Sequence, residues 1–172
     1  MTGLRIAHVC AGPGSTPGAM VGASQISGVA AALVALGHHV TVFAARLLDE
    51  ALSVDVGQGP ASANGFDVVY EQYSIGHRGG LELARRLGVP FVLQMDAPLS
   101  LDSSTYRAEK VTVADCMIED ELLATADLVI TVSAGLMHWA ARRRHGPTIT
   151  LSDPGVGTDS LACIASVARV NC

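Results

Sequence analysis

One aspartate, Asp96, stands where a carboxylate could take part in chemistry. It follows the apolar run Val89–Met95, which predicts a β-strand, and it precedes Ala97 and Pro98. Ligands of open parallel sheets bind at the carboxyl ends of the strands, so Asp96 could accept hydrogen bonds from hydroxyl groups or act as a general base. An aspartate before Ala-Pro is equally an ordinary turn former. Asp96 is therefore the candidate catalytic residue, with both interpretations open.

Three polar side chains follow another predicted strand, Phe66–Glu71, and could line a rim around the same edge. Tyr73, His77 and Arg78 carry a hydroxyl, an imidazole and a guanidinium, which suit a small hydroxylated ligand. The simpler interpretation of His77 is a solvated side chain near the start of the next helix, and we favour it. These side chains could thus line the rim of a ligand site, in which His77 is more simply a solvated residue.

Other titratable residues are interpreted as structural. Glu71 ends its strand, and we expect it to pair with Arg78 or Arg107. His8 lies in the middle of the first strand, and His38 and His39 open the second strand at the opposite edge of the sheet. None of these positions predicts catalysis.

A glycine-rich segment, Gly12–Gly22, follows the first predicted strand, Leu4–Cys10. It leads into a helix expected over Ser24–Leu36, whose free amides at Ala23, Ser24 and Gln25 could face an anion. The alternative is a flexible surface loop. Because the segment falls where an α/β sheet usually binds its ligand, we predict a phosphate-contacting element, made by Gly14, Gly18, Gly22, Ala23 and Ser24.

This segment does not fit a dinucleotide-binding fingerprint. Gly12 and Gly14 are followed by Pro17 where G-x-G-x-x-G requires its third glycine. The second strand ends in Ala44, Ala45 and Arg46 rather than in an acidic residue that could hold a ribose. An NAD-dependent dehydrogenase is therefore disfavoured.

The elements that must position these residues alternate along the chain. Apolar runs typical of strands separate stretches with helical periodicity, which predicts an α/β fold: one Rossmann-like, doubly wound parallel sheet of about six strands with helices on both faces. The remaining expected strands are 40–45, 127–132 and 148–151, the remaining helices are 80–87, 109–126 and 134–144, and the loops are 51–65 and 97–105. We expect one domain over residues 1–161, followed by an unmatched tail over residues 162–172.

Composition narrows the function classes. The chain has 172 residues, of which 49% are hydrophobic and 16% charged, and its net charge is −5. These values favour a packed globular domain and argue against nucleic acid as a partner. The apolar run Val29–Leu36 is far shorter than the ~20 residues of a membrane helix, and no signal peptide is visible. We therefore expect a cytoplasmic protein without stable membrane insertion.

Metal and disulfide sites are not predicted. The four cysteines, Cys10, Cys116, Cys163 and Cys172, include no CxxC pair, and acidic residues do not cluster as a cation site requires. No cofactor is expected either.

Five segments together resemble the N-terminal, acceptor-side domain of retaining GT-B glycosyltransferases, the group 1 or family 4-like enzymes. The resemblance covers roughly residues 4–161. The five segments, in the order of that family, are residues 5–9, 22–25, 32–42, 66–71 and 126–133.

The resemblance implies transfer of a hexose from a nucleotide-sugar, as co-substrate, to a hydroxyl acceptor. In such enzymes the first domain holds mainly the acceptor, and a second domain holds the nucleotide-sugar. By position, the glycine-rich element would approach the donor phosphates, and the acceptor pocket would include Asp96, Pro98 and Ser100. We add Tyr73, His77, Arg78 and Arg107 as acceptor-binding candidates. The sequence ends before the second domain, so this half is expected to be inactive alone.

The chain also departs from the family pattern. Ile26 stands where many members have a histidine, and Gln94, Met95 and Asp96 stand where another is common. The usual proline-asparagine-glycine-valine-aspartate signature is replaced by Asp153–Gly157. Polar contacts expected from that signature are therefore lost.

Three functions remain open at this stage. The first is a glycosyltransferase half that works with a donor-binding domain or chain. The second is a non-catalytic module that binds sugar or phosphate. The third is an interaction protein that associates with another copy of itself. We favour the first because of the resemblance.

Overall fold

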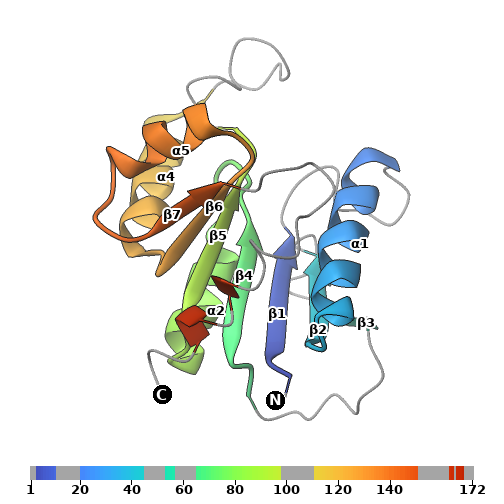
Figure 1. Cartoon of the computed structure of the whole chain (residues 1–172). Helices are drawn as coiled ribbons and strands as arrows, with labels where there is room; N and C mark the ends of the chain where they lie inside the picture. The colour runs from blue at the N-terminus through green and yellow to red at the C-terminus, as the bar shows by residue number, and fades with distance from the viewer. Residues whose placement is uncertain are drawn as a thin grey trace.

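The structure is a computed structural model of the chain. It describes residues 3–10, 20–44, 53–56, 65–97, 111–150, 163–164 and 166–168. Seven strands and four helices with numbered labels make up this part (Figure 1). The strands are β1 (Arg5–Cys10), β2 (His39–Ala44), β3 (Ser53–Val56), β4 (Val68–Gln72), β5 (Phe91–Met95), β6 (Leu128–Thr131) and β7 (Thr148–Thr150). The helices are α1 (Met20–Ala35), α2 (Gly79–Leu87), α4 (Val113–Thr125) and α5 (Ala134–Ala141).

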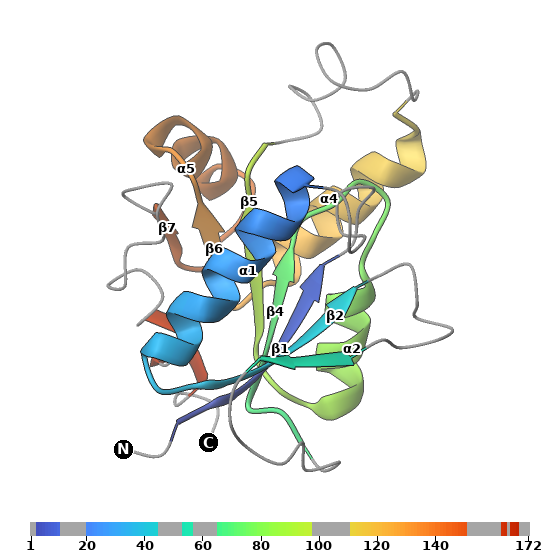
Figure 2. The same ribbon diagram turned by 90° about the vertical axis from the view of Figure 1, so that its right-hand side faces the viewer.

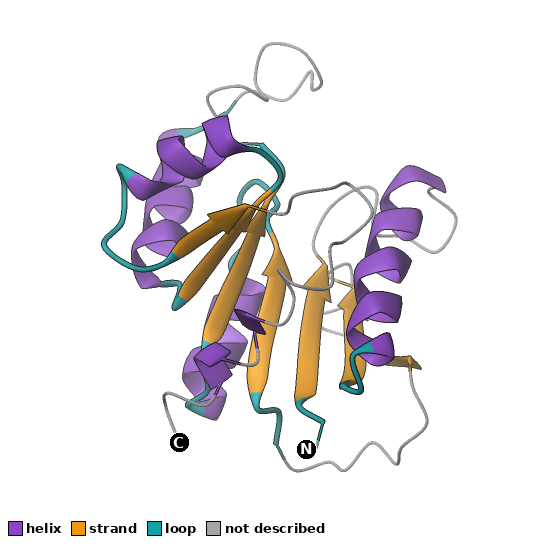
Figure 3. Cartoon of the chain, viewed as in Figure 1, coloured by secondary structure: helices purple, strands orange, loops and turns teal. Residues whose placement is uncertain are grey.

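All seven strands form one sheet in the order β3-β2-β1-β4-β5-β6-β7. The six strands other than β3 run parallel, which confirms the predicted α/β fold (Figure 3). The seventh, β3, is an addition: it lies inside the expected loop 51–65 and pairs antiparallel with β2. Ser-Val-Asp-Val is only four residues long, and glycine and proline follow it closely in the sequence, so it gave no strand signal.

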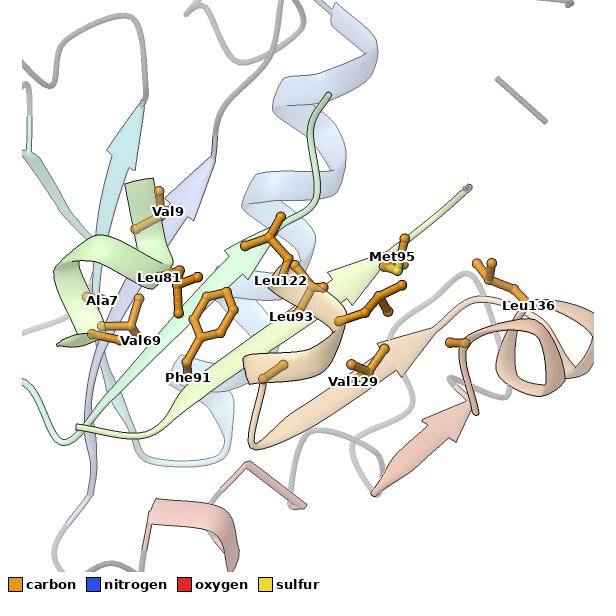
Figure 4. Close-up of a cluster of buried hydrophobic side chains, with 14 residues drawn as sticks. Ala7, Val9, Val69, Leu81, Phe91, Leu93, Met95, Leu122, Val129 and Leu136 are labelled. Atoms are coloured by element: carbon orange, nitrogen blue, oxygen red, sulfur yellow. The ribbon is translucent and has the colours of Figure 1, made fainter. Parts of the chain in front are cut away.

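Two hydrophobic cores lie on opposite faces of the sheet. One packs α1 through Val29, Ala30 and Leu33 against alternate strand residues such as Ile6 and Val68. The other packs α2, α4 and α5 against the intervening strand residues; Figure 4 shows Leu81 and Leu122 near Phe91 and Leu93, and Leu136 at the Met95 end of the cluster. Figure 2 shows α1 crossing one side of the sheet, with α2 and α4 beyond it. The chain is therefore doubly wound, as predicted.

Part of the expected tail belongs to the first core. Ile164 is fully buried and Ala168 is 4% exposed, and both pack with α1 and the sheet residues beneath it. Short helical turns at residues 163–164 and 166–168 carry these side chains. These residues therefore add to the core on the α1 face, where fewer helices cover the sheet.

Local sequence signals fix the ends of several elements. Ser133 caps α5, because its Oγ accepts the Leu136 N–H at 3.2 Å. Gly88 ends α2 with φ 68°, a left-handed conformation that glycine adopts without strain. Thr112 and Asp115 form a reciprocal capping box at the start of α4. The predicted helix boundaries therefore differ from the observed ones by a few residues only.

Arg144 serves the end of a helix other than the one expected to contain it. The predicted helix 134–144 would end in Arg142–Arg144, where positive charge is favoured by the helix dipole. In the structure α5 ends at Ala141, and Arg144 instead donates from Nε to the Leu123 carbonyl at 3.0 Å and from Nη2 to the Ala126 carbonyl. Arg144 is 7% exposed, so it satisfies the buried C-terminal carbonyls of α4, a different helix.

Candidate functional site

The sheet reverses its winding between β1 and β4. The chain passes from β1 to β2 on one side and then returns to β4, which pairs directly with β1 on the other side. Cys10 and Gln72 are partners in register at the carboxyl ends of these two strands. In open α/β sheets this switch point is the usual place for a ligand. The residues around Gln72 are therefore the strongest candidates for a site.

A hydrogen-bonded chain of polar side chains runs along this edge on the α1 face. The Gln72 Nε2 donates to Asp96 Oδ2 at 2.9 Å, and the Gln94 Nε2 donates to Asp96 Oδ1 at 2.9 Å. Tyr70 in turn donates its hydroxyl to Gln94 Oε1. The chain begins at Tyr70, which is fully buried, and ends at Gln72 and Asp96, which are partly exposed. The buried hydroxyl of Tyr70 thus supports Gln72 and Asp96, the partly exposed polar pair at the switch point.

The buried end of this chain is neutral. Burial, followed by the Asp96 charge, raises the pKa of Tyr70 well above its usual value of 10, so the phenol keeps its proton and acts as donor. His8 packs edge-on against the Tyr70 ring, with centroids 4.9 Å apart. Burial lowers the pKa of His8 to about 4, and neither ring nitrogen has a partner among the described residues. The His8 ring is thus an uncharged packing partner of the Tyr70 ring.

Asp96 follows β5 directly, as predicted. Two amide donors hold its carboxylate, and no salt bridge to it is found within the described ranges. A carboxylate oxygen has room for more than one hydrogen bond, so Asp96 keeps acceptor capacity for a ligand hydroxyl. The geometry suits hydroxyl recognition or proton acceptance.

The neighbouring Cys10 is not a nucleophile. Its side chain is 1% exposed, and burial together with the nearby Glu71 carboxyl raises the pKa of the thiol to about 12. Nucleophilic cysteines react as thiolates, which this environment disfavours.

Glu71 points to the other face of the sheet, where it accepts a hydrogen bond from α2. Its Oε2 accepts the backbone N–H of Leu81 at 3.3 Å, at the first turn of α2. The expected pairing with Arg78 was wrong, because Arg78 binds Glu82 and Glu121 instead; Arg107 lies outside the described residues. Burial raises the pKa of Glu71 to about 7 although the helix amides oppose this shift. Glu71 is therefore a buried structural carboxyl.

The predicted rim residues are directed toward α2 and α4. Tyr73 donates its hydroxyl to Glu119 Oε2 at 2.8 Å, and Arg78 contacts Glu82 at 2.9 Å and Glu121 at 3.2 Å. His77 is exposed, in agreement with the solvated interpretation. These contacts anchor the segment after β4 to the helices of the opposite face. Tyr73 also meets Gln94 through the backbone, because its N–H donates to the Gln94 carbonyl at 2.7 Å, but its hydroxyl is directed to Glu119 rather than to Asp96.

The glycine-rich element is described only in part. Gly22, Ala23 and Ser24 lie inside α1, which begins at Met20 rather than at Ser24. The amides without an intrahelical partner are those of the first four residues, so the Ser24 and Gln25 amides expected to face an anion are used within the helix. Four further candidates, Gly14, Gly18, Pro98 and Ser100, and also Arg107, lie outside the described residues.

Sequence reasoning missed three members of the polar chain: Tyr70, Gln72 and Gln94. A signal was present, because Gln94 interrupts the otherwise apolar β5, and Tyr70 and Gln72 are polar residues in the second half of β4. Tyr70 and Gln72 alternate on β4, as Gln94 and Asp96 do across the end of β5, so each pair shares a face.

Comparisons with known proteins add no assignment. No protein-family model matches the chain, and no curated protein matches it. Within the described residues, no group of three or more potential ligands could hold a metal ion. No helix there is long and apolar enough to cross a membrane.

Proposed function

We propose that the chain is the acceptor-side domain of a glycosyltransferase of the retaining GT-B type. The domain binds a carbohydrate or another hydroxylated acceptor at the β1–β4 switch point. Transfer of a hexose from a nucleotide-sugar then takes place when a donor-binding domain or chain completes the site. The proposal rests on the sequence resemblance together with the polar chain that ends in Asp96.

The position of Asp96 is the structural observation that supports this proposal most strongly. Its carboxylate lies at the switch-point edge, partly exposed, and is held by Gln72 and Gln94 at 2.9 Å each. The carboxylate accepts hydrogen bonds and the neighbouring amide N–H donates them, so the two together match a hydroxyl group, which does both. Asp96 is thus the residue that orients an acceptor hydroxyl and takes up its proton.

Stabilisation of the leaving phosphate is assigned elsewhere. A departing nucleotide develops negative charge, which a site must meet with positive charge or oriented dipoles. His8 stays neutral and Asp96 is a carboxylate, so neither residue supplies positive charge. The amides of the first turn of α1 supply part of the dipole contribution, and the complementary domain supplies the rest. In this proposal the described residues bind the acceptor, and turnover depends on the complementary domain.

A binding comparison tests the proposal. The wild type and Asp96→Asn are titrated with methyl α-D-glucopyranoside and with a nucleotide-sugar, with NMR detection suited to millimolar dissociation constants. We expect the wild type to bind the glycoside and Asp96→Asn to bind it at least about tenfold more weakly, because a carboxylate acceptor is worth roughly 1.4 kcal/mol or more.

Asp120→Asn is the matched control, since Asp120 is exposed on α4. This variant should bind as the wild type does. Absence of glycoside binding by the wild type would reject an acceptor site, and equal binding by Asp96→Asn would move the site away from Asp96.

A further inference from the structure

The Gln94 side chain has one orientation that satisfies both of its neighbours. A glutamine amide has an oxygen that accepts and a nitrogen that donates, and rotation by half a turn exchanges them. Tyr70 remains a protonated phenol, so its hydroxyl donates to Gln94 Oε1. The Gln94 Nε2 is thereby directed to Asp96 Oδ1 at 2.9 Å. A flipped amide would place its oxygen against the carboxylate.

The Tyr70 hydroxyl is itself fixed in place by its surroundings. The ring is fully buried and packs in the α1-side core, with the uncharged His8 ring edge-on at 4.9 Å. Gln94 is only 5% exposed, so no bulk water replaces the phenol as a donor to its oxygen. A buried amide without this partner would carry the cost of an unsatisfied polar group.

At the partly exposed end, Gln72 and Asp96 form a donor–acceptor pair. The Gln72 amide nitrogen lies 2.9 Å from Asp96 Oδ2 and keeps a second N–H for another acceptor. Two neighbouring hydroxyls of a sugar ring match this pair, one donating to the carboxylate and the other accepting from the amide. The ligand class is therefore a vicinal diol.

We infer that Tyr70 is a positioning residue that acts through Gln94 to fix Asp96, so that Gln72 and Asp96 bind a vicinal diol of the acceptor. The inference rests on the proposed function and deepens it. Tyr70 does not touch the ligand. Its hydroxyl determines which atom of Gln94 faces the carboxylate, and Asp96 then presents its remaining lone pairs in one direction.

The test uses two independent readouts on the full chain. In the absence of ligand, NMR follows hydrogen exchange of the Gln94 side-chain amide in the wild type and in Tyr70→Phe. With ligand, both proteins are titrated with methyl α-D-glucopyranoside and with its fully O-methylated analogue, which cannot donate hydrogen bonds. We expect Tyr70→Phe to speed Gln94 amide exchange at least about threefold and to weaken glycoside binding about tenfold, and we expect the methylated analogue not to bind.

Thr131→Val is the matched control. Thr131 is fully buried at the end of β6, on the face of the sheet opposite Gln94, and its hydroxyl donates to the Ile149 carbonyl at 3.1 Å. This variant also loses one buried hydroxyl, so it reports general loss of stability. We expect Thr131→Val to leave Gln94 amide exchange and glycoside affinity unchanged. Gln94→Glu, which puts a second carboxylate beside Asp96, should weaken binding at least as much as Tyr70→Phe.

The outcomes separate the two claims. Binding by Tyr70→Phe at wild-type affinity, with unchanged Gln94 exchange, overturns the positioning role and leaves the acceptor site standing. Lack of glycoside binding by the wild type overturns both the acceptor site and the diol assignment, while the exchange readout still decides whether Tyr70 orients Gln94. Binding of the methylated analogue with equal affinity overturns the diol assignment alone.

Discussion

The Glu71 carboxyl lies directly beneath the first turn of α2, with Oε2 3.3 Å from the backbone nitrogen of Leu81. Its other oxygen, Oε1, is buried without a partner among the described residues. Burial raises the pKa of Glu71 from 4.5 to about 7. One residue thus connects the end of β4 to a helix and makes the stability of the fold depend on pH.

Replacing Glu71 by glutamine should remove this dependence. The folded pKa is raised, so the Glu71 contribution is fully present below about pH 4.5 and is lost as the pH rises to about 7. The shift corresponds to a loss on the order of 3 kcal/mol across that window. Urea unfolding of wild type and Glu71→Gln between pH 4.5 and 8 measures it; a difference in unfolding free energy that stays constant with pH would contradict the prediction.

His8 should produce the opposite dependence. Its folded pKa is lowered from 6.5 to about 4, so the stability contributed by neutral His8 is present above pH 6.5 and is lost as the pH falls toward 4. His8→Phe keeps a ring against Tyr70 and cannot titrate. We expect this variant to gain stability relative to wild type as the pH falls from 6.5 to 4, by roughly 3 kcal/mol.

Because the two windows overlap, the contributions of His8 and Glu71 offset each other between about pH 4.5 and 6.5. Chemical denaturation of both variants at pH 5 and pH 6.5 distinguishes them. If the unfolding free energies of the two variants, each taken relative to wild type, change with pH in the same direction, the opposing roles of His8 and Glu71 are refuted.

A side chain at position 80 should destabilise the fold. A Cβ built there would lie 2.7 Å from Glu71 Oε2 and 2.8 Å from Glu71 Cβ, and the latter atom cannot move away easily. We expect Gly80→Ala to lower the unfolding free energy by about 1–3 kcal/mol, the usual cost of overpacking.

Gly135 is the control, since it also lies near the start of a helix, but a Cβ added there would have nothing within 4 Å. Gly135→Ala should be neutral or stabilise by up to about 1 kcal/mol, because alanine favours helix. Thermal unfolding of both variants decides the point, and a similar loss for both would show that Glu71 is not the cause.

Arg144 should be required for the end of α4. Its guanidinium donates to the carbonyls of Leu123 and Ala126 and also to that of Pro147. Arg144→Met would leave these carbonyls without a donor, at a cost of about 3 kcal/mol, and Arg144→Lys would restore part of it.

The exposed neighbour Arg142 supplies the comparison for this prediction. Arg142→Met should change the unfolding free energy by less than about 0.5 kcal/mol. Equal effects at the two positions, measured by urea unfolding, would mean that Arg144 contributes only surface charge.

The order and type of the main elements followed from local pattern, whereas partners distant in sequence did not. Alternating apolar runs and caps such as Ser133 are read within a few residues, so β5 and Asp96 were placed correctly. Tyr73 and Arg78 meet Glu119 and Glu121 across 46 and 43 residues, and spacing alone gives no sign of these contacts. The prediction of a ligand-site rim at Tyr73 and Arg78 therefore missed that both side chains contact α4.

The same limit explains the polar chain. Asp96 was visible because it ends a strand, but Gln72 and Tyr70 join it only through the pairing of β4 with β5. That register comes from the assembled sheet rather than from either strand alone.

The most direct test of the account is an NMR titration of the isotope-labelled chain with methyl α-D-glucopyranoside, following the side-chain amide signals of Gln72 and Gln94. An acceptor site at the β1–β4 switch point predicts saturable shifts of both amides, with little change at the exposed surface of α4. Glycoside at saturating concentration that moves neither amide would contradict the proposed site.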